Sequence, residues 1–343
     1  MKKIAIYAET GKSVGLGHLI RCSAIAEELC RKCSITFITP EAANIEAFQI
    51  KNARYMQVIS PVVNDEAFVF GLKKLFEKEN VRIALLDSYY ITQNILLELN
   101  KVCKIIVFDG NHRYPLGINM VINYTLKASC KNYAQRYGGM VSLAIGPKFF
   151  PLRSNFRLVP PIKIEKKVKD IFVSLGGSGV SAEAVKLFSL IEEIDENLNI
   201  YAVGGEELHE LDVIKKDSKI HFYSNIKNIE EVMTKCDIAV SAAGTTLYEL
   251  LFLGIPVISF AVAENQLVNK ELEDILLWCG LIDMAAVDKR QWDRSKEIIE
   301  NKLRFLLESY EARKKMSERG KRFIDGLGAE RIAELIEKLE DRK

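Results

Sequence analysis

The chain has 343 residues, 48% of them apolar, and its 48 basic and 46 acidic side chains leave a net charge of +2. This composition is typical of a soluble globular protein with room for two domains, and it lacks the basic excess that binds nucleic acid. Glu9 and Lys12 interrupt the apolar start far short of a signal peptide or a membrane span, so we expect a cytoplasmic protein. The seven cysteines are odd in number and show no paired short spacing, which indicates reduced thiols rather than disulfides. Cys30 and Cys33 form a single C-x-x-C motif, and no second cysteine pair or histidine pair lies nearby to complete a metal site.

In the first half, short apolar runs alternate with helix-periodic segments. We expect strands at residues 3–8, 35–39, 55–59, 81–86 and 104–109, and helices at 18–29, 65–79 and 91–101. Alternation of this kind predicts a parallel sheet covered by helices.

The pattern weakens between residues 146 and 169, where four prolines precede a lysine-rich piece. We therefore predict a first domain at 1–155, a linker at 156–168, a second domain at 169–325 and a C-terminal helix at 326–343. The second half again predicts strands, at 170–175, 200–203, 220–223, 236–240 and 257–260, with a weaker strand signal at 284–287. The two halves thus predict two Rossmann-like α/β domains that face a cleft, although they share no sequence repeat.

The stretch from Ser241 to Pro256 predicts a strand, a tight turn and a helix. Small residues at such a turn leave backbone N–H groups uncovered, and the start of a helix carries partial positive charge, so the turn can hold a phosphate. The residues concerned are Ser241, Ala243, Gly244 and Thr245. Glu249, one turn inside the helix, is placed to accept hydrogen bonds from a ribose diol. An ordinary strand-to-helix connection is the alternative.

Further polar and glycine residues follow the other predicted strands, where ligands of parallel sheets bind. They are Gly15, Gly17 and His18 after the first strand, Asp87 and Tyr89 after the fourth, Asp109 after the fifth, and Gly176 and Gly177 after the linker. The Walker loop is excluded because Ile6 stands where its first glycine belongs, and a dinucleotide fingerprint would need a third glycine. No His, Cys or Asp cluster has metal-binding spacing.

His18 is the candidate general base, because an imidazole beside two glycines at a helix start is approachable and the helix disfavours its protonated form. A histidine that only caps the helix or is solvated is the alternative. Asp87 and Asp109 are candidates to orient His18 or to bind sugar hydroxyls, or else they cap the turns that follow. Asn265 and Gln266 bring amides to the same strand ends, unless they only begin the next helix.

These motifs together resemble the UDP-sugar hydrolase family of pseudaminic acid biosynthesis and related spore-coat polysaccharide proteins. The matching stretches are residues 15–22, 87–89, 108–109, 146–153, 174–178, 241–250 and 264–266. The resemblance implies a GT-B fold and a UDP-linked amino or acetamido sugar that water attacks at the anomeric carbon, without metal or other cofactor. It also implies His18 as the catalytic base, with Tyr89, Arg153 and Asn265 near the sugar or the cleft. Ser241 to Thr245 then match the diphosphate turn, and Glu249 matches the ribose-binding glutamate.

One position departs from the family pattern, since Gly110 stands where a second acidic residue commonly follows the Phe-Asp pair. Two alternatives stay open: an inverting glycosyltransferase that uses the same site, and a non-catalytic nucleotide-sugar-binding protein. The sequence indicates neither the sugar's stereochemistry nor the oligomeric state.

Overall fold

The computed structural model describes residues 2–10, 16–40, 53–57, 66–109, 114, 116–125, 128–160, 162–175, 181–204, 219–224, 226–262, 264–282 and 289–339. The chain divides into two compact units. Unit 1 comprises Met1–Arg153 together with Gly326–Lys343, and unit 2 comprises Ser154–Asp325. No helix among the described residues is long and apolar enough to cross a membrane.

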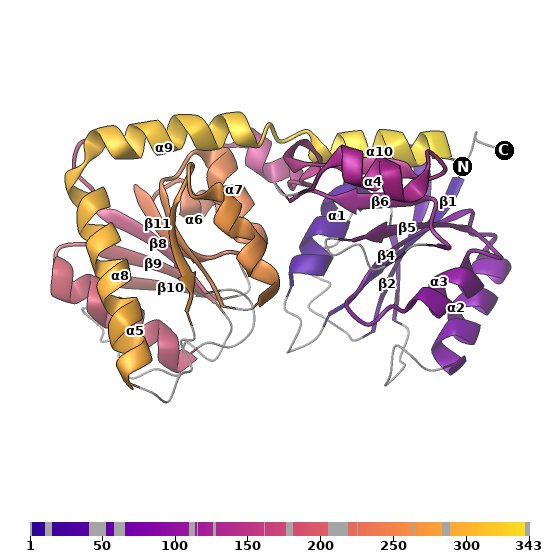
Figure 1. Cartoon of the computed structure of the whole chain (residues 1–343), viewed down its shortest axis with the longest axis horizontal. Coiled ribbons are helices and arrows are strands. Elements are labelled where there is room, and N and C mark those ends of the chain that lie inside the picture. The colour runs from indigo at the N-terminus through magenta and orange to yellow at the C-terminus, as the bar shows by residue number, and fades with distance from the viewer. Residues whose placement is uncertain are drawn as a thin grey trace. The chain divides into compact units, whose positions relative to one another are not determined.

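Unit 1 is built on a parallel sheet of seven strands in the order β3-β2-β1-β4-β5-β6-β7 (Figure 1). The strands are β1 (Lys2–Ala8), β2 (Cys33–Thr39), β3 (Ala53–Gln57), β4 (Ile83–Asp87), β5 (Lys104–Phe108), β6 (Met120–Asn123) and β7 (Ser142–Ile145). The chain order reverses beside β1, which pairs with β2 on one side and β4 on the other. Ligands of open parallel sheets bind at such a reversal, outside the carboxyl ends of the strands.

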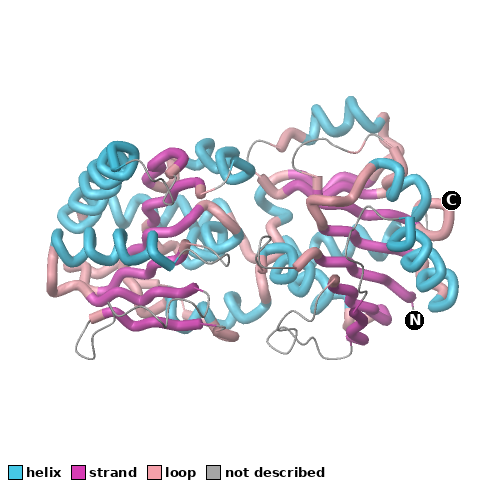
Figure 2. The backbone as a smooth tube through the Cα atoms, turned by 90° about the horizontal axis from the view of Figure 1, so that it is seen from below, coloured by secondary structure: helices cyan, strands magenta, loops and turns pink. Residues whose placement is uncertain are grey.

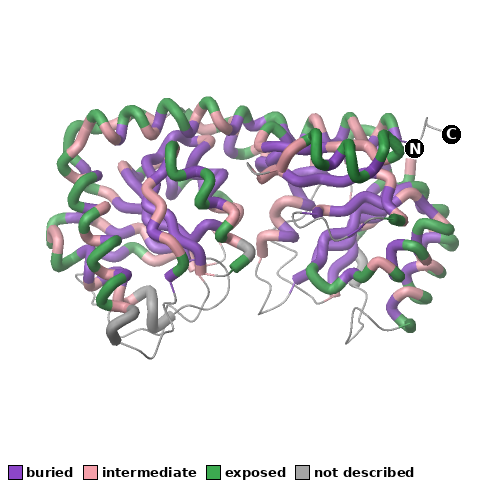
Figure 3. The backbone as a smooth tube through the Cα atoms, in the orientation of Figure 1, coloured by how far each residue is buried: buried purple, intermediate pink, exposed green. Residues whose placement is uncertain are grey.

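Helices cover both faces of this sheet, whose described strands are largely buried (Figure 3). The strand side chains alternate between two apolar cores, one on each face. One core lies under α1 (Gly17–Leu29) and the C-terminal helix α10 (Gly328–Leu339), and it takes Ile4, Ile6 and Leu85 from the strands. The other core lies under α2 (Glu66–Glu79), α3 (Gln93–Leu99) and α4 (Cys130–Tyr137). A residue's position along a strand therefore decides which helices its side chain meets.

Unit 2 repeats this layering around a six-stranded parallel sheet in the order β10-β9-β8-β11-β12-β13 (Figure 2). The strands are β8 (Asp170–Ser174), β9 (Asn199–Gly204), β10 (Ile220–Ser224), β11 (Ile238–Ala242), β12 (Val257–Ala261) and β13 (Leu277–Leu281). Helices α5 (Ser181–Ile194) and α8 (Lys289–Glu308) close the main apolar core of the unit. The short helix α6 (Ile229–Met233) leads into β11, and α7 (Thr245–Leu253) packs on α9 (Tyr310–Phe323).

The last helix, α10, belongs to unit 1, although α8 and α9 precede it in unit 2 (Figure 1). It packs against α1 through Ile332, Ala333 and Ile336. Its start allows only a glycine, because a Cβ on Gly328 would lie 2.0 Å from the carbonyl oxygen of Phe150. The sequence pattern predicted this helix at 326–343 but did not indicate the unit on which it packs.

Several elements were not predicted from the sequence. Strands β6, β7 and β13 are four or five residues long, and α4 carries mostly polar residues, so none gives a strong periodic signal. The segment after β12 forms the 3-10 helix η5 (Glu264–Leu272), where a helix was expected. The weak strand signal at 284–287 lies outside the described residues.

Candidate functional site

His18 lies in the first turn of α1, where the chain enters the helix from the carboxyl end of β1, and its side chain is only 3% exposed. Its Nδ1 atom lies 3.1 Å from the backbone carbonyl oxygen of Asp87 and 3.4 Å from Oδ1 of the same residue. Because both oxygens accept hydrogen bonds, they favour the tautomer in which Nδ1 carries the proton. Nε2 of the neutral ring is then the nitrogen with a lone pair, as a general base requires.

Asp87 ends β4 and is the residue that holds this imidazole. The same carbonyl oxygen also accepts the backbone N–H of Glu9 at 2.9 Å, so the end of the sheet fixes its position. The carboxylate accepts two hydrogen bonds from Arg21, from Nε to Oδ2 at 2.6 Å and from Nη2 to Oδ1 at 2.5 Å. Burial alone would raise the pKa of the Asp87 carboxyl, but the charges of Arg21 and His18 lower it below its usual value.

Arg21 is itself held in place on three sides. Its guanidinium lies 4.5 Å from the ring centroid of Phe108, and Nη1 donates to the Tyr124 hydroxyl at 3.2 Å. A guanidinium stacked on an aromatic face and forked onto a carboxylate uses the planar geometry that lysine lacks. The neighbouring Cys22 thiol lies 3.5 Å from Asp87 Oδ2, and burial raises its pKa, so it remains a neutral donor.

Tyr89 is the exposed neighbour of His18. Its side chain is 46% exposed, and its ring meets the imidazole edge-to-face with 4.6 Å between the centroids. The next residue, Tyr90, is also exposed. Aromatic rings that present one face to solvent beside a buried polar group are suited to pack against a sugar ring.

Asp109 lies on the other face of the sheet. It directly follows β5, one residue past the register position opposite Asp87, and it is fully buried. Its Oδ2 accepts the backbone N–H of Tyr114 at 3.4 Å, and its carbonyl oxygen accepts the Tyr133 hydroxyl at 2.6 Å. The structure therefore brings Asp87, but not the Asp109 carboxylate, to the face that carries His18.

Glu9 was not singled out from the sequence. This buried carboxylate at the end of β1 accepts hydrogen bonds from Ser88 Oγ at 2.6 Å and from the Tyr7 hydroxyl at 3.3 Å. Burial, and next the charge of Glu9, raises the pKa of Tyr7. The sequence signal that would have pointed to Glu9 is an acidic residue between an apolar strand and a glycine-rich loop.

In unit 2, β11 runs into α7 through Ala243 and Gly244, and Gly244 is the N-cap of the helix. Two hydrogen bonds hold Ala243 in this turn: its N–H donates to Phe260 O at 2.8 Å, and its carbonyl oxygen accepts from Asn269 Nδ2 at 2.9 Å. Asn269 is in turn held by the Tyr248 hydroxyl, which donates to its Oδ1 at 2.8 Å. A Cβ on Gly244 would meet only Gln266 Nε2, at 3.9 Å, so the backbone here is approachable. The turn therefore has the geometry of an anion site at the start of a helix.

Other predicted residues surround this turn or lie apart from it. Ser241 is fully buried and its hydroxyl donates to Ala242 O at 3.0 Å, whereas Thr245 is half-buried in the first turn of α7. Gln266 Oε1 accepts the backbone N–H of Val262 at 2.9 Å, which places its amide beside Gly244. Glu249 is buried, at 2% exposure.

The remaining predicted residues are not among those that form the two arrangements described above. Arg153 is half-buried at the end of the first segment of unit 1, and Gly17 opens α1. The backbone of Asn265 belongs to η5, but its side chain is outside the described part of the chain, as are Gly15, Gly176 and Gly177. The described residues hold no group of three His, Cys, Asp or Glu side chains that could bind a metal ion.

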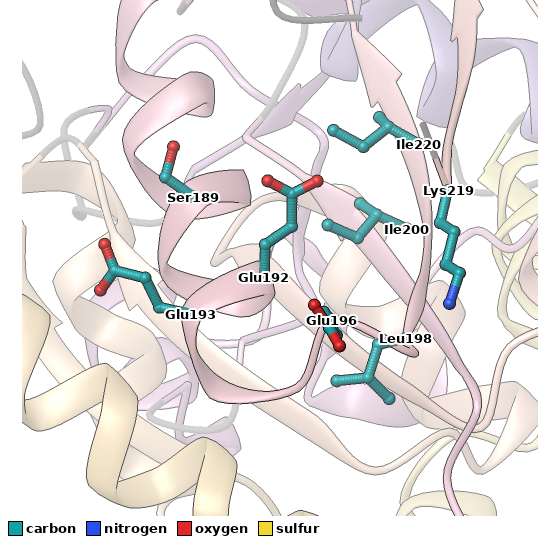
Figure 4. Close-up of a pocket in the computed structure, with 8 residues that line it drawn as sticks. All are labelled: Ser189, Glu192, Glu193, Glu196, Leu198, Ile200, Lys219 and Ile220. Atoms are coloured by element: carbon teal, nitrogen blue, oxygen red, sulfur yellow. The ribbon is translucent and has the colours of Figure 1, made fainter. Parts of the chain in front are cut away.

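A hollow of about 560 Å³ lies elsewhere in unit 2 (Figure 4). Glu192, Glu193 and Glu196 line it from the end of α5 and the turn after it, and Ile200 and Ile220 line it from the starts of β9 and β10. It is therefore at the amino ends of the strands, away from α7, and none of the predicted site residues lines it.

No protein-family model matches the chain. Among curated proteins, it is 22% identical to the spore coat polysaccharide biosynthesis protein SpsG of Bacillus subtilis, with 99% of both chains covered. It is 28% identical to a Helicobacter pylori protein named pseudaminic acid cytidylyltransferase and UDP-2,4-diacetamido-2,4,6-trideoxy-beta-L-altropyranose hydrolase, covering 76% of this chain and 45% of that protein. It is also 26% identical to the uncharacterized protein MJ1062 of Methanocaldococcus jannaschii, covering 80% of this chain and 58% of that protein.

Solved structures establish the fold. The MurG structure of Acinetobacter baumannii superposes with a TM-score of 0.70 at 14% identity, covering 98% of this chain and all of that one. The Staphylococcus aureus MnaA–UDP co-structure superposes with a TM-score of 0.66 at 13% identity, covering 99% of this chain and 97% of that one. The chain therefore has the GT-B-like fold of two parallel-sheet α/β domains, and the resemblance inferred from its motifs is confirmed.

Proposed function

We propose that the protein acts on a UDP-linked amino or acetamido sugar in surface polysaccharide or nonulosonic acid biosynthesis, and that it hydrolyses this sugar at the anomeric carbon. The observation that carries base-assisted attack at the anomeric carbon is the His18 imidazole, which is held through Nδ1 by the end of β4 beside the exposed ring of Tyr89. The hydrolase named in the Helicobacter pylori relative, and SpsG along the whole chain, support the substrate class.

In this proposal His18 acts as a general base. Nε2 takes a proton from water as the water oxygen bonds to the anomeric carbon on the face opposite UDP. The bond from that carbon to the β-phosphate oxygen breaks, and its electron pair leaves with UDP. Attack from the opposite face inverts the configuration, and the proton on His18 passes to solvent. A diphosphate is already a stable anion, so the leaving group needs no strong general acid.

Unit 2 supplies the nucleotide site in this proposal. The N-terminus of α7 accepts the diphosphate, because its first N–H groups and the helix dipole favour an anion, and Gly244 lets the phosphate come close. Glu249 binds the ribose hydroxyls, and the Gln266 amide lies beside the phosphate turn.

A product assay tests the proposal. Purified protein is incubated with UDP-linked diacetamido-trideoxyhexoses and with UDP-N-acetylglucosamine, and UDP and free sugar are followed by NMR in water without any acceptor. Release of both products supports the hydrolase. His18→Ala is expected to lower turnover by about 10² or more while UDP affinity, measured by calorimetry, stays within a factor of about two. A fully active His18→Ala variant would remove the base assignment.

An inverting glycosyltransferase is the second candidate, and the fold likeness to the spinosyn rhamnosyltransferase SpnG, with a TM-score of 0.59 at 11% identity, favours it. A hydroxyl of an acceptor then takes the place of water, and the same base accepts its proton. Turnover that appears only when an acceptor is added would support transfer over hydrolysis. Tight UDP binding with no product under either condition would instead support a non-catalytic binding protein.

A further inference from the structure

His18 has a neighbour that should work against its role as a base. Oδ1 of the buried Asp87 lies 3.4 Å from Nδ1, and a carboxylate at that distance in a low-dielectric environment favours the protonated imidazolium. An imidazolium has no lone pair to accept a proton from water. A base in this position therefore needs a second charge that offsets the carboxylate.

Arg21 supplies that charge. Its two hydrogen bonds engage both oxygens of Asp87, so the imidazole faces an ion pair with no net charge rather than an isolated carboxylate. The guanidinium cannot swing away easily, because Phe108 lies against its face and Tyr124 binds Nη1. It also stays charged at any pH at which the protein is folded.

The other titratable groups around His18 in the described part of unit 1 do not offset the charge of Asp87 as Arg21 does. Cys22 is a buried thiol whose pKa is raised, so it adds no negative charge. Tyr89 meets the imidazole with its ring edge-to-face. Glu9 projects to the opposite face of the sheet, where Ser88 and Tyr7 bind its carboxylate. Among the described groups of unit 1 discussed above, Asp87 and Arg21 are therefore the charged pair that acts on the imidazole.

We propose that Arg21 is a positioning residue whose charge keeps the His18 imidazole in its neutral form, with Nε2 unprotonated, so that His18 is available as a base near neutral pH. The catalytic meaning of this inference rests on the proposed function. Its structural content does not, because the ionisation of His18 can be measured without any turnover.

The direct test is an NMR titration of the histidine imidazoles in the full chain. Of the four histidines, His18 is assigned by the signal that disappears in His18→Gln. Arg21→Gln is expected to raise the titration midpoint of His18 by about 1 to 3 pH units. Arg31→Gln is the matched control: Arg31 follows α1, is 64% exposed and pairs with Glu28, so its removal should leave the midpoint unchanged. An unchanged midpoint in Arg21→Gln would overturn the inference.

Two further variants separate charge from folding. In Arg21→Gln/Asp87→Asn both charges are absent, so the midpoint should return to within about half a pH unit of the unmodified protein. Arg21→Lys keeps the charge but cannot form the two parallel hydrogen bonds to Asp87, and it should raise the midpoint less than Arg21→Gln does. If Arg21→Gln does not fold, the single variant Asp87→Asn decides: without the carboxylate, the charge of Arg21 should hold the midpoint of His18 below that of the double variant, and equal midpoints would overturn the inference.

Kinetics provide an independent readout. In Arg21→Gln the acidic limb of the kcat/KM profile should move to higher pH together with the NMR midpoint. The decrease in kcat/KM relative to the unmodified protein should therefore be greatest at low pH. An equal loss at every pH would indicate a purely structural role and overturn the inference. If the unmodified protein releases no sugar, the proposed function fails, while the titration still decides the role of Arg21.

Discussion

Gly320 of α9 lies so close to Leu251 of α7 that a Cβ atom built on the glycine would stand 2.8 Å from the Leu251 carbonyl oxygen. This approach lets α9 pack directly along the helix whose N-terminus is the candidate phosphate site. At the far end of α7, Gly254 has a φ of 76° and lies under the Lys321 side chain, whose Nζ donates to Ile162 O at 3.0 Å. Gly320 of α9 and the C-cap residue Gly254 thus allow α7 and α9 to pack closely.

We predict that Gly320→Ala destabilises the protein, even though alanine favours helices. A Cβ cannot be accommodated against backbone atoms without moving one helix, which should lower the free energy of unfolding by about 1 to 3 kcal/mol. Gly71→Ala is the matched control: Gly71 lies inside α2 with nothing within 4 Å of its Cβ position. That variant should gain about 0.5 to 1 kcal/mol. Urea denaturation of both variants checks the prediction, which fails if the two changes have the same sign.

Asp87→Asn should remove stability in a pH-dependent way. At neutral pH it leaves the mostly buried Arg21 without its carboxylate, at a cost of about 3 kcal/mol. The pKa of Asp87 is lower in the folded state than its ordinary value of 3.8, so the stabilisation is complete above that value. It is lost as the pH falls through the lower pKa of the folded state. Denaturation curves from pH 7 down to 2 should therefore converge for the two proteins. A constant difference across that range would contradict this account.

Gly244→Ala should separate nucleotide binding from folding. The backbone of Gly244, with φ −93° and ψ −156°, suits alanine, and the added Cβ meets only the Gln266 amide at 3.9 Å. Stability should thus change by less than about 0.5 kcal/mol. The methyl group would narrow the approach of a phosphate to the helix N-terminus, so we expect UDP to bind at least about tenfold more weakly, a loss of about 1.4 kcal/mol. Calorimetric titration with UDP measures this, and unchanged affinity would place the diphosphate elsewhere.

Arg313→Met should strongly destabilise unit 2. This arginine is 1% exposed, and it donates to the carbonyl oxygens of Leu306 and Leu307 near the end of α8 and to those of Glu165 and Lys166 before β8. Its loss leaves these acceptors without their charged donor, at about 2 to 4 kcal/mol. The exposed Arg319 on the same helix binds a single carbonyl oxygen, of Asp274, and Arg319→Met should cost less than about 1 kcal/mol. Thermal unfolding of both variants checks this prediction. Equal losses of stability in Arg313→Met and Arg319→Met would contradict it.

The sequence predicted the strands that carry the site because each is a continuous apolar run followed by polar or glycine residues. The run before Asp87 becomes β4, and the run before Ala243 becomes β11. A strand buried on both faces needs apolar residues throughout, so this signal is local and strong. It was weaker for β6, β7 and β13, whose short runs are recognisable as strands only beside their neighbours.

Residue types and their order along the chain thus determined the fold class and the candidate residues His18, Asp87 and Glu249. Tertiary structure alone decided that His18 and Asp87 meet. The sequence did not distinguish Asp87 from Asp109, since both follow a buried strand, but their positions differ by one residue in register, which sends their side chains to opposite faces of the sheet. Nor did it pair Arg21 with Asp87 across 66 residues, or place α10 on unit 1. Such contacts depend on strand order and helix packing, which local patterns do not encode.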